Sequence, residues 1–253
     1  MISLYESILQ STKAGKRSLI EKWLSDTKNV FGPGSKILDY KIKSDDTVEV
    51  NDDYFWITFE GYEQLPEYIK FANYEGHIIL GKSGGFSEHR INSFAGLPKK
   101  IKKLSVYCGT KTTCLPKLDV EISNKFTFSG PNINMYEGLH IKFNNEDNGL
   151  PGARTLYIDF FETSFSSWKV ENCDTIDLTG DDRLAKTFAK SVNQKYTRLN
   201  SKTSPLEYPI EEKGLQQMKE FFGGIDLSTV NNILLTKHIA IRKINGKFYK
   251  VRI

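Results

Sequence analysis

The chain has no long apolar run and little net charge. None of its apolar stretches approaches the roughly 20 residues that a membrane-spanning helix needs, so the sequence predicts no membrane partner. Its 35 Lys and Arg residues are offset by 31 Asp and Glu residues, which leaves a formal charge of +4. So weak a field does not favour nucleic acid as the main partner, and any basic patch has to be local.

The first nine residues contain no basic leader, no long apolar stretch and no small-residue cleavage site. We therefore expect a protein that is not secreted. The chain also has only three cysteines, Cys108, Cys114 and Cys173, with no CxxC pair and no neighbouring group of histidines that could complete a zinc site. We predict three buried thiols in a reducing compartment and no metal site.

Recognisable catalytic motifs are missing as well. The four histidines, His77, His89, His140 and His238, are scattered, and none has the spacing or neighbours of a metalloprotease or a nucleophile motif. The run Gly81–Gly85 follows an apolar stretch but lacks the first glycine of a phosphate-binding loop. The sequence thus gives no support for an enzyme and predicts no cofactor, although a fold can hold a site that leaves no local motif.

The N-terminal segment, residues 1–34, shows two short helical patterns. Leu4, Ile8 and Leu9 form the first apolar stripe, and a second stripe lies between Leu19 and Leu24. We predict a helical N-terminal arm whose first stripe either binds a partner or packs on the protein's own domain, which makes it a candidate partner-binding element. From residue 36 to about residue 80 the alternation becomes that of strands separated by Asp-rich turns, and we expect antiparallel pairing there.

Leu-Pro pairs mark the middle of the chain, in the predicted strand-rich segment 35–180. They occur at Leu65, Leu97, Leu115 and Leu150, and the last three lead into an apolar rhythm that ends in apolar, polar, apolar. The residues that we take as equivalent are Leu104, Leu118, Leu139, Leu156 and Ile176. They and the apolar residues two positions later are expected to form one buried core on neighbouring strands: Val106, Val120, Ile141, Ile158 and Leu178.

The spacing from Leu97 to Val106, Leu-Pro-x-x-Ile-x-x-Leu-x-Val, resembles a degenerate leucine-rich repeat. This resemblance implies an irregular solenoid in which each coil contributes one short strand to a continuous core and leaves its outward residues as a free surface. The alternative, which the same alternation permits, is a β-sandwich core with appended helices. Both readings place the chain in the α+β class.

Segment 181–253 is predicted to hold two helices and a hairpin. One helix starts after Asp181 or Asp182, a second runs from Glu211 to Phe222, and Asn245-Gly246 joins two terminal strands. The hairpin combines basic and aromatic side chains, a composition that binds single-stranded nucleic acid in other proteins. The alternative, which we favour, is a hairpin with one solvated face whose lysines discourage edge-to-edge aggregation. Its candidate nucleic-acid contacts are Arg242, Lys243, Lys247, Tyr249, Lys250 and Arg252.

The opening Ser3-Leu4-Tyr5-Glu6-Ser7-Ile8-Leu9 resembles the start of many proteins encoded by crAss-like bacteriophages of gut Bacteroides. This resemblance implies a phage protein in the virion or in the cytoplasm of the infected cell. Three functions remain open. They are a non-catalytic structural or interaction protein that binds other proteins, including virion proteins, through its repeat surface and N-terminal arm; a nucleic-acid-binding accessory factor; and an enzyme without a recognisable motif.

Overall fold

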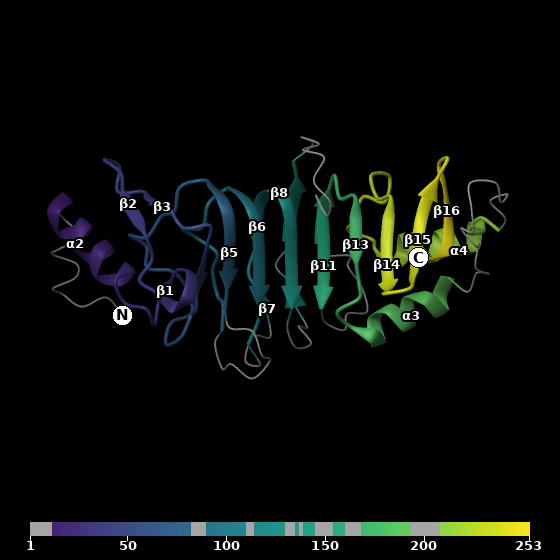
Figure 1. Ribbon diagram of the computed structural model, residues 1–253, viewed down its shortest axis with the longest axis horizontal. Coiled ribbons are helices and arrows are strands. Elements are labelled where there is room, and N and C mark those ends of the chain that lie inside the picture. Colours follow the sequence, from purple (N-terminus) through teal and green to yellow (C-terminus); the bar gives the residue numbers. More distant parts are fainter. Residues whose placement is uncertain are drawn as a thin grey trace.

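The computed structural model describes residues 12–81, 90–109, 114–129, 135–136, 139–144, 154–159, 168–192 and 208–253. The protein is mixed α and β, as predicted, and its strands stand side by side along the long axis of the molecule (Figure 1). The helices are α2 (Lys13–Leu24), η1 (Pro33–Ser35, a 3-10 turn), α3 (Asp182–Val192) and α4 (Glu212–Phe221). In this part of the chain, no helix combines the length and apolarity required to cross a membrane.

The strands, in chain order, are β1 (Val30–Phe31), β2 (Tyr40–Ile42), β3 (Val48–Val50), β4 (Tyr54–Ile57), β5 (Tyr74–Leu80), β6 (Lys100–Tyr107), β7 (Cys114–Leu115), β8 (Leu118–Ser129), β9 (Met135–Tyr136), β10 (Leu139–Phe143), β11 (Thr155–Asp159), β12 (Trp168–Glu171), β13 (Thr175–Asp177), β14 (Asn232–Thr236), β15 (Ile239–Ile244) and β16 (Lys247–Arg252). Twelve of them form one sheet, whose main path runs β1-β4-β5-β6-β8-β11-β13-β14-β15-β16. This path ends at β1 and β16, so the described strands do not close into a barrel.

Parallel pairing dominates this main sheet. Each neighbouring pair from β4 to β14 is parallel, and only the two ends, β1–β4 and β14–β15–β16, are antiparallel. The antiparallel pairing expected between residues 36 and 80 is correct for β2–β3 and wrong for β4–β5. The antiparallel sandwich alternative is likewise wrong for these strands. Apolar–polar alternation reports only which side chains face inward, and strand direction depends on the long connections that parallel neighbours require.

One inward ladder of apolar residues crosses the main sheet. Ile78, Leu104, Phe126, Leu156 and Ile176 lie opposite one another on adjacent strands, and each is fully buried. They are 26, 22, 30 and 20 residues apart in the sequence. Since each strand by itself would expose this face, the apolar area is removed from water only when the strands lie side by side.

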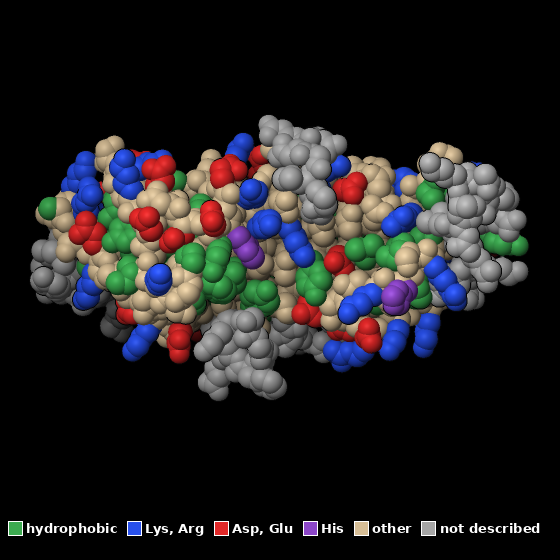
Figure 2. Space-filling model, in the orientation of Figure 1, with side chains coloured by type: hydrophobic (Ala, Val, Ile, Leu, Met, Phe, Trp, Pro, Cys, Tyr) green, Lys and Arg blue, Asp and Glu red, His purple; other side chains and the backbone are tan. Residues whose placement is uncertain are grey.

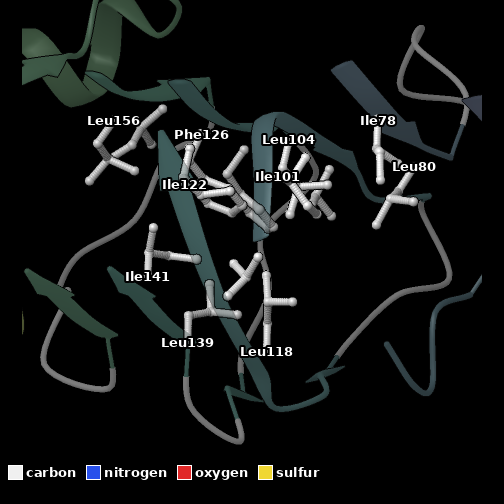
Figure 3. Packing of buried hydrophobic residues seen from close by; sticks show 14 of the residues in the cluster. Ile78, Leu80, Ile101, Leu104, Leu118, Ile122, Phe126, Leu139, Ile141 and Leu156 are labelled. Atoms are coloured by element: carbon white, nitrogen blue, oxygen red, sulfur yellow. The ribbon is translucent and has the colours of Figure 1, made fainter. Parts of the chain in front are cut away.

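A second layer of strands lies against the buried side. The first half of β8 pairs in parallel with β10, which pairs in parallel with β12, and this places Leu118, Leu139 and Trp168 in one register. The ring of Trp168 meets those of Phe126 and Phe128 from the main sheet, with centroids 6.5 and 5.6 Å apart. Figure 3 shows side chains from both sets of strands meeting in one cluster. The core therefore lies between two strand layers.

The ten predicted core residues are all buried and belong to one cluster, which confirms that prediction. The assumed equivalence of the five leading residues is wrong. Leu104, Leu156 and Ile176 lie in the main sheet, whereas Leu118 and Leu139 lie in the second layer. A single apolar run can supply both layers, as β8 does, so the sequence alone does not show at which residue the chain passes from one layer to the other.

Helix α2 matches the second apolar stripe of the predicted N-terminal arm. It buries Leu19, Ile20, Trp23 and Leu24, and the Thr12 hydroxyl caps it by accepting a hydrogen bond from the Gly15 backbone N–H at 3.0 Å. The first stripe, Leu4, Ile8 and Leu9, lies outside the described residues.

The C-terminal elements agree closely with prediction. Asp181 caps α3 by accepting a hydrogen bond from the Leu184 backbone N–H at 3.2 Å, and Asn245 and Gly246 take the positive φ angles, 49° and 76°, of a tight hairpin turn. Strand β14 pairs with β13, so the sheet continues across residue 180. On the outer edge of β16, the Ile210 N–H donates to the Phe248 carbonyl oxygen at 2.7 Å. The edge strand at the other end, β1, has only two residues.

Candidate binding face of the main sheet

The outward face of the main sheet is ordered in rows. Because successive residues of a strand point to opposite sides, the neighbours of the inward ladder form two outward rows across the strands. The first contains Tyr54, His77, Lys103, Lys125 and Thr155, and the second contains Trp56, Ile79, Ser105, Thr127, Tyr157 and Asp177. In Figure 1, β5, β6, β8 and β11 face the viewer without a described helix in front of them.

Two lysines stand side by side on this face. Lys103 and Lys125 are directly opposite in the β6–β8 register, and His77 is the neighbour of Lys103 on β5. Figure 2 shows basic side chains gathered over these strands. Within the described part of the chain, neither lysine forms an ion pair with a carboxylate. Directly opposed like charges destabilise a sheet, so this arrangement has a cost in the isolated protein.

The second strand layer shows the contrasting arrangement. Its outward residues alternate in charge, and His140 lies between Asp119 and Glu171, with ring nitrogen to carboxylate distances of 3.1 and 3.2 Å. Lys169 also pairs with Glu171. His140 thus has carboxylate partners on both neighbouring strands and Lys169 has one on its own strand, whereas Lys103 and Lys125 have none among the described residues.

His77 is neutral at physiological pH. Burial, together with the positive charges of Lys103 and Lys125, lowers its pKa to about 4. Its Nε2 lies 2.8 Å from the Ser105 Oγ, so the imidazole and the hydroxyl share a hydrogen bond. A histidine that activates a serine needs a pKa near the working pH, and a pKa of about 4 makes this imidazole a weak base.

A depression of about 310 Å³ lies at the centre of this face. It is lined by His77, Lys103, Ser105, Tyr107, Lys125, Thr127 and Tyr157. The Lys125 ammonium sits over the Tyr157 ring, 4.5 Å from its centroid, where the negative face of the ring holds the cation in place. Gly180 leaves room for this ring, because a Cβ there would lie 2.5 Å from the Tyr157 hydroxyl oxygen. Two ammonium groups and several hydroxyls together suit an anionic group.

An aromatic cluster flanks the depression on the side of β4. Trp56 stacks on Phe31 with centroids 5.1 Å apart, and Tyr54 meets the Trp56 ring edge-on at 5.2 Å. All three side chains are partly exposed. Rings that are held by one another present a rigid apolar surface that loses little entropy on binding.

Acidic side chains flank the depression on the opposite side. Asp159 on β11 accepts a hydrogen bond from the Ser129 hydroxyl at 3.2 Å, and burial followed by the charge of Asp181 raises its pKa. Asp177 on β13 accepts hydrogen bonds from the Thr179 backbone N–H and hydroxyl at 3.0 and 2.7 Å. The face thus passes from aromatic to basic to acidic between β4 and β13.

The hairpin residues proposed for nucleic-acid contact do not form one open surface. Tyr249 and Lys250 are buried, and the Lys250 ammonium reaches the Ala189 carbonyl oxygen of α3 at 3.4 Å. The Lys243 ammonium donates to the carbonyl oxygens of Leu227 and Ser228 at 3.1 and 2.7 Å. Arg242 is partly buried, and only Lys247 and Arg252 are well exposed. Lys243 and Lys247 also line an apolar hollow of about 520 Å³ beside α4.

The thiols agree with prediction where they are described. Cys108 and Cys173 are buried, and burial raises the pKa of the Cys173 thiol to about 12. The Cys114 side chain and His89 lie outside the described part. In the ranges that the structure describes, no group of His, Cys, Asp or Glu is arranged to hold a metal ion.

Sequence reasoning did not identify the central cluster. Lys103 and Lys125 each precede an inward apolar residue, Leu104 and Phe126, and that shared position was the available signal. It becomes informative only when Leu104 and Phe126 are known to be opposite each other, and Phe126 was not among the residues taken as equivalent. No protein-family model, curated protein or solved structure matches the chain.

Proposed function

We propose that the protein is a non-catalytic interaction protein that binds another protein through the outward face of its main sheet. In this proposal the chain is an irregular, leucine-rich-repeat-like solenoid, in which successive passes contribute one strand to each layer. The parallel register from β4 to β14 and the second layer of β8, β10 and β12 support that architecture. A stack of this kind presents one continuous face to a partner.

The observation behind this proposal is the pair Lys103 and Lys125, which has no carboxylate partner among the described residues and lies at the centre of a face that no described helix covers in Figure 1. A partner with complementary charge removes the repulsion that the free protein tolerates. The exposed aromatic cluster beside it supplies the apolar contact on which most binding energy in protein interfaces rests. The neutral His77 adds a hydrogen-bonding group and no further charge.

Nucleic-acid binding through the hairpin has less support than protein binding through this face, because several hairpin side chains are buried or hydrogen-bonded within the protein. A role in the phage virion rests on the opening residues alone, and the partner-binding role of Leu4, Ile8 and Leu9 remains a separate proposal. Their deletion should abolish incorporation into virions without lowering the melting temperature.

Filling the depression tests the proposed function. Thr127→Trp places an indole in the hollow and should abolish co-purification of the partner found with the tagged wild-type protein in infected cells. Lys142→Trp is the matched control, because Lys142 is exposed on the second layer. Lys142→Trp should keep the wild-type melting temperature. Thr127 is buried, so Thr127→Trp should lower the melting temperature by the modest amount expected of a larger side chain at a packed position, and circular dichroism should show that this variant remains folded. Retention of the partner by Thr127→Trp, or its loss from Lys142→Trp alone, would refute the assignment of the binding face.

A further inference from the structure

Aromatic, basic and acidic side chains follow one another across the strands of the main sheet, and this order indicates what kind of segment could bind there. Trp56 lies on β4, the two lysines on β6 and β8, and Asp159 and Asp177 on β11 and β13. Neighbouring strands are about 4.8 Å apart. The aromatic cluster is therefore roughly 10 Å from Lys103, and Lys125 is roughly 10 Å from Asp177.

We propose that this face binds an extended acidic segment of a partner protein, laid across the strands, which presents an apolar residue, two acidic residues and a basic residue in that order. The inference deepens the proposed function and depends on it. An extended chain advances about 3.3 Å per residue. The apolar residue then lies about three positions before the first acidic residue, and the basic residue about three positions after the second.

The acidic side chains of the segment meet Lys103 and Lys125 in the depression. Both lysines are partly buried, so their interaction with a carboxylate is screened less than that of a fully exposed pair. The cation–π contact already holds the Lys125 ammonium, which reduces the side-chain entropy lost on binding. The hydroxyl of Ser105 and the imidazole of His77 supply further hydrogen-bonding groups at the floor.

The flanking carboxylates favour a protein segment over a nucleic acid. A nucleic-acid strand carries a negative phosphate at every nucleotide, and one that crosses the face would bring phosphates onto Asp159 and Asp177. A peptide can place its negative charge at the two lysines and a positive charge at the two aspartates. Like charges brought together oppose the wrong partner and so add to specificity.

Two synthetic peptides of one composition test the proposed order. The ordered peptide has the core Leu-Gly-Ser-Glu-Ser-Glu-Ser-Gly-Lys, and the rearranged peptide has the core Glu-Gly-Ser-Leu-Ser-Lys-Ser-Gly-Glu, which places acids at both flanks whichever way the chain runs. Titration of each into the full-length protein is followed by the imidazole resonances of His77, which are identified by their loss in His77→Gln. We expect the ordered peptide to bind about tenfold more tightly, as two favourable charge pairs imply.

Charge reversal supplies the second measurement. Lys103→Glu with Lys125→Glu should abolish that preference, whereas Lys142→Glu with Lys169→Glu on the second layer should leave it unchanged. Equal binding of the two peptides, or a preference that survives reversal at Lys103 and Lys125, overturns the proposal. So does tighter binding of a nine-residue oligothymidylate through the same lysines, which would indicate nucleic acid.

The result of the peptide titrations can be distinguished from the result of the Thr127→Trp test of the proposed function. If the peptides fail while Thr127→Trp still abolishes partner binding, the face is correct and the acidic segment is wrong. If both experiments fail, the binding face itself is wrong.

Discussion

The contact of Trp168 with Phe128 tests whether two strand layers enclose one core. Both side chains are almost completely buried, and their rings meet edge-to-face with centroids 5.6 Å apart. Truncating either to alanine would cost about 3–5 kcal/mol, and the two losses together would approach the whole stability of an ordinary domain. Milder changes, Phe128→Leu and Trp168→Phe, keep the variants folded. An aromatic pair of this geometry is expected to show about 0.5–1.5 kcal/mol of coupling.

The assay is urea unfolding of the wild type, the two single variants and the double variant, followed by circular dichroism. The control cycle replaces Phe128→Leu by Phe55→Leu. Phe55 is equally buried, but it lies on β4, three strands from β8 and therefore roughly 14 Å from Phe128. In the control cycle, the effects of Phe55→Leu and Trp168→Phe on the free energy of unfolding should add to within about 0.5 kcal/mol. Coupling no larger than this control would refute contact between the layers.

Three further predictions concern the face and the thiols. The pKa of His77 is about 4 in the folded protein, against an ordinary value of 6.5. The free energy by which the wild type is more stable than His77→Gln should therefore be fully present above pH 6.5 and should fall as the pH is lowered toward 4. A stability difference that does not change with pH in paired thermal melts would contradict the lowered pKa. Gly180→Ala would bring a Cβ to 2.5 Å from the Tyr157 hydroxyl oxygen and 2.8 Å from the Asp159 Cβ. This crowding should lower the free energy of unfolding by about 1–3 kcal/mol. An unchanged melting temperature would show that Tyr157 is not held against Gly180. Because burial raises the thiol pKa of both Cys108 and Cys173, iodoacetamide should label these residues only in urea, and peptide mapping that finds label under native conditions would contradict their burial.

Local features of the fold could be predicted from the sequence because local chemistry determines them. The Asp181 cap, the burial of α2 and the Asn245-Gly246 turn depend on residues close together in the chain. The burial of Leu104, Leu118 and the other core residues followed from alternation alone. These elements required no knowledge of which strand lies beside which.

Register could not be predicted because it depends on distant residues. β8 contributes to both layers without a break, so Leu118 and Phe126 belong to different ladders although eight residues separate them. The site depends on the same information, since Lys103 and Lys125 become neighbours only through the β6–β8 pairing. The basic hairpin, which is obvious in the sequence, proved to use Lys243 and Lys250 for internal hydrogen bonds.

The two ends of the main sheet bear on self-assembly. An open sheet of mostly parallel strands offers unpaired backbone groups at its margins, and such margins can template filaments. Here the first margin is the two-residue strand β1, which is too short to seat a foreign strand. At the other margin the Ile210 N–H already occupies the Phe248 carbonyl, and Lys247 and Arg252 bring positive charge to the same strand. Among the described residues, these two margins of the main sheet therefore offer little open backbone to a second copy of the chain, which disfavours lengthening of the sheet by polymerisation.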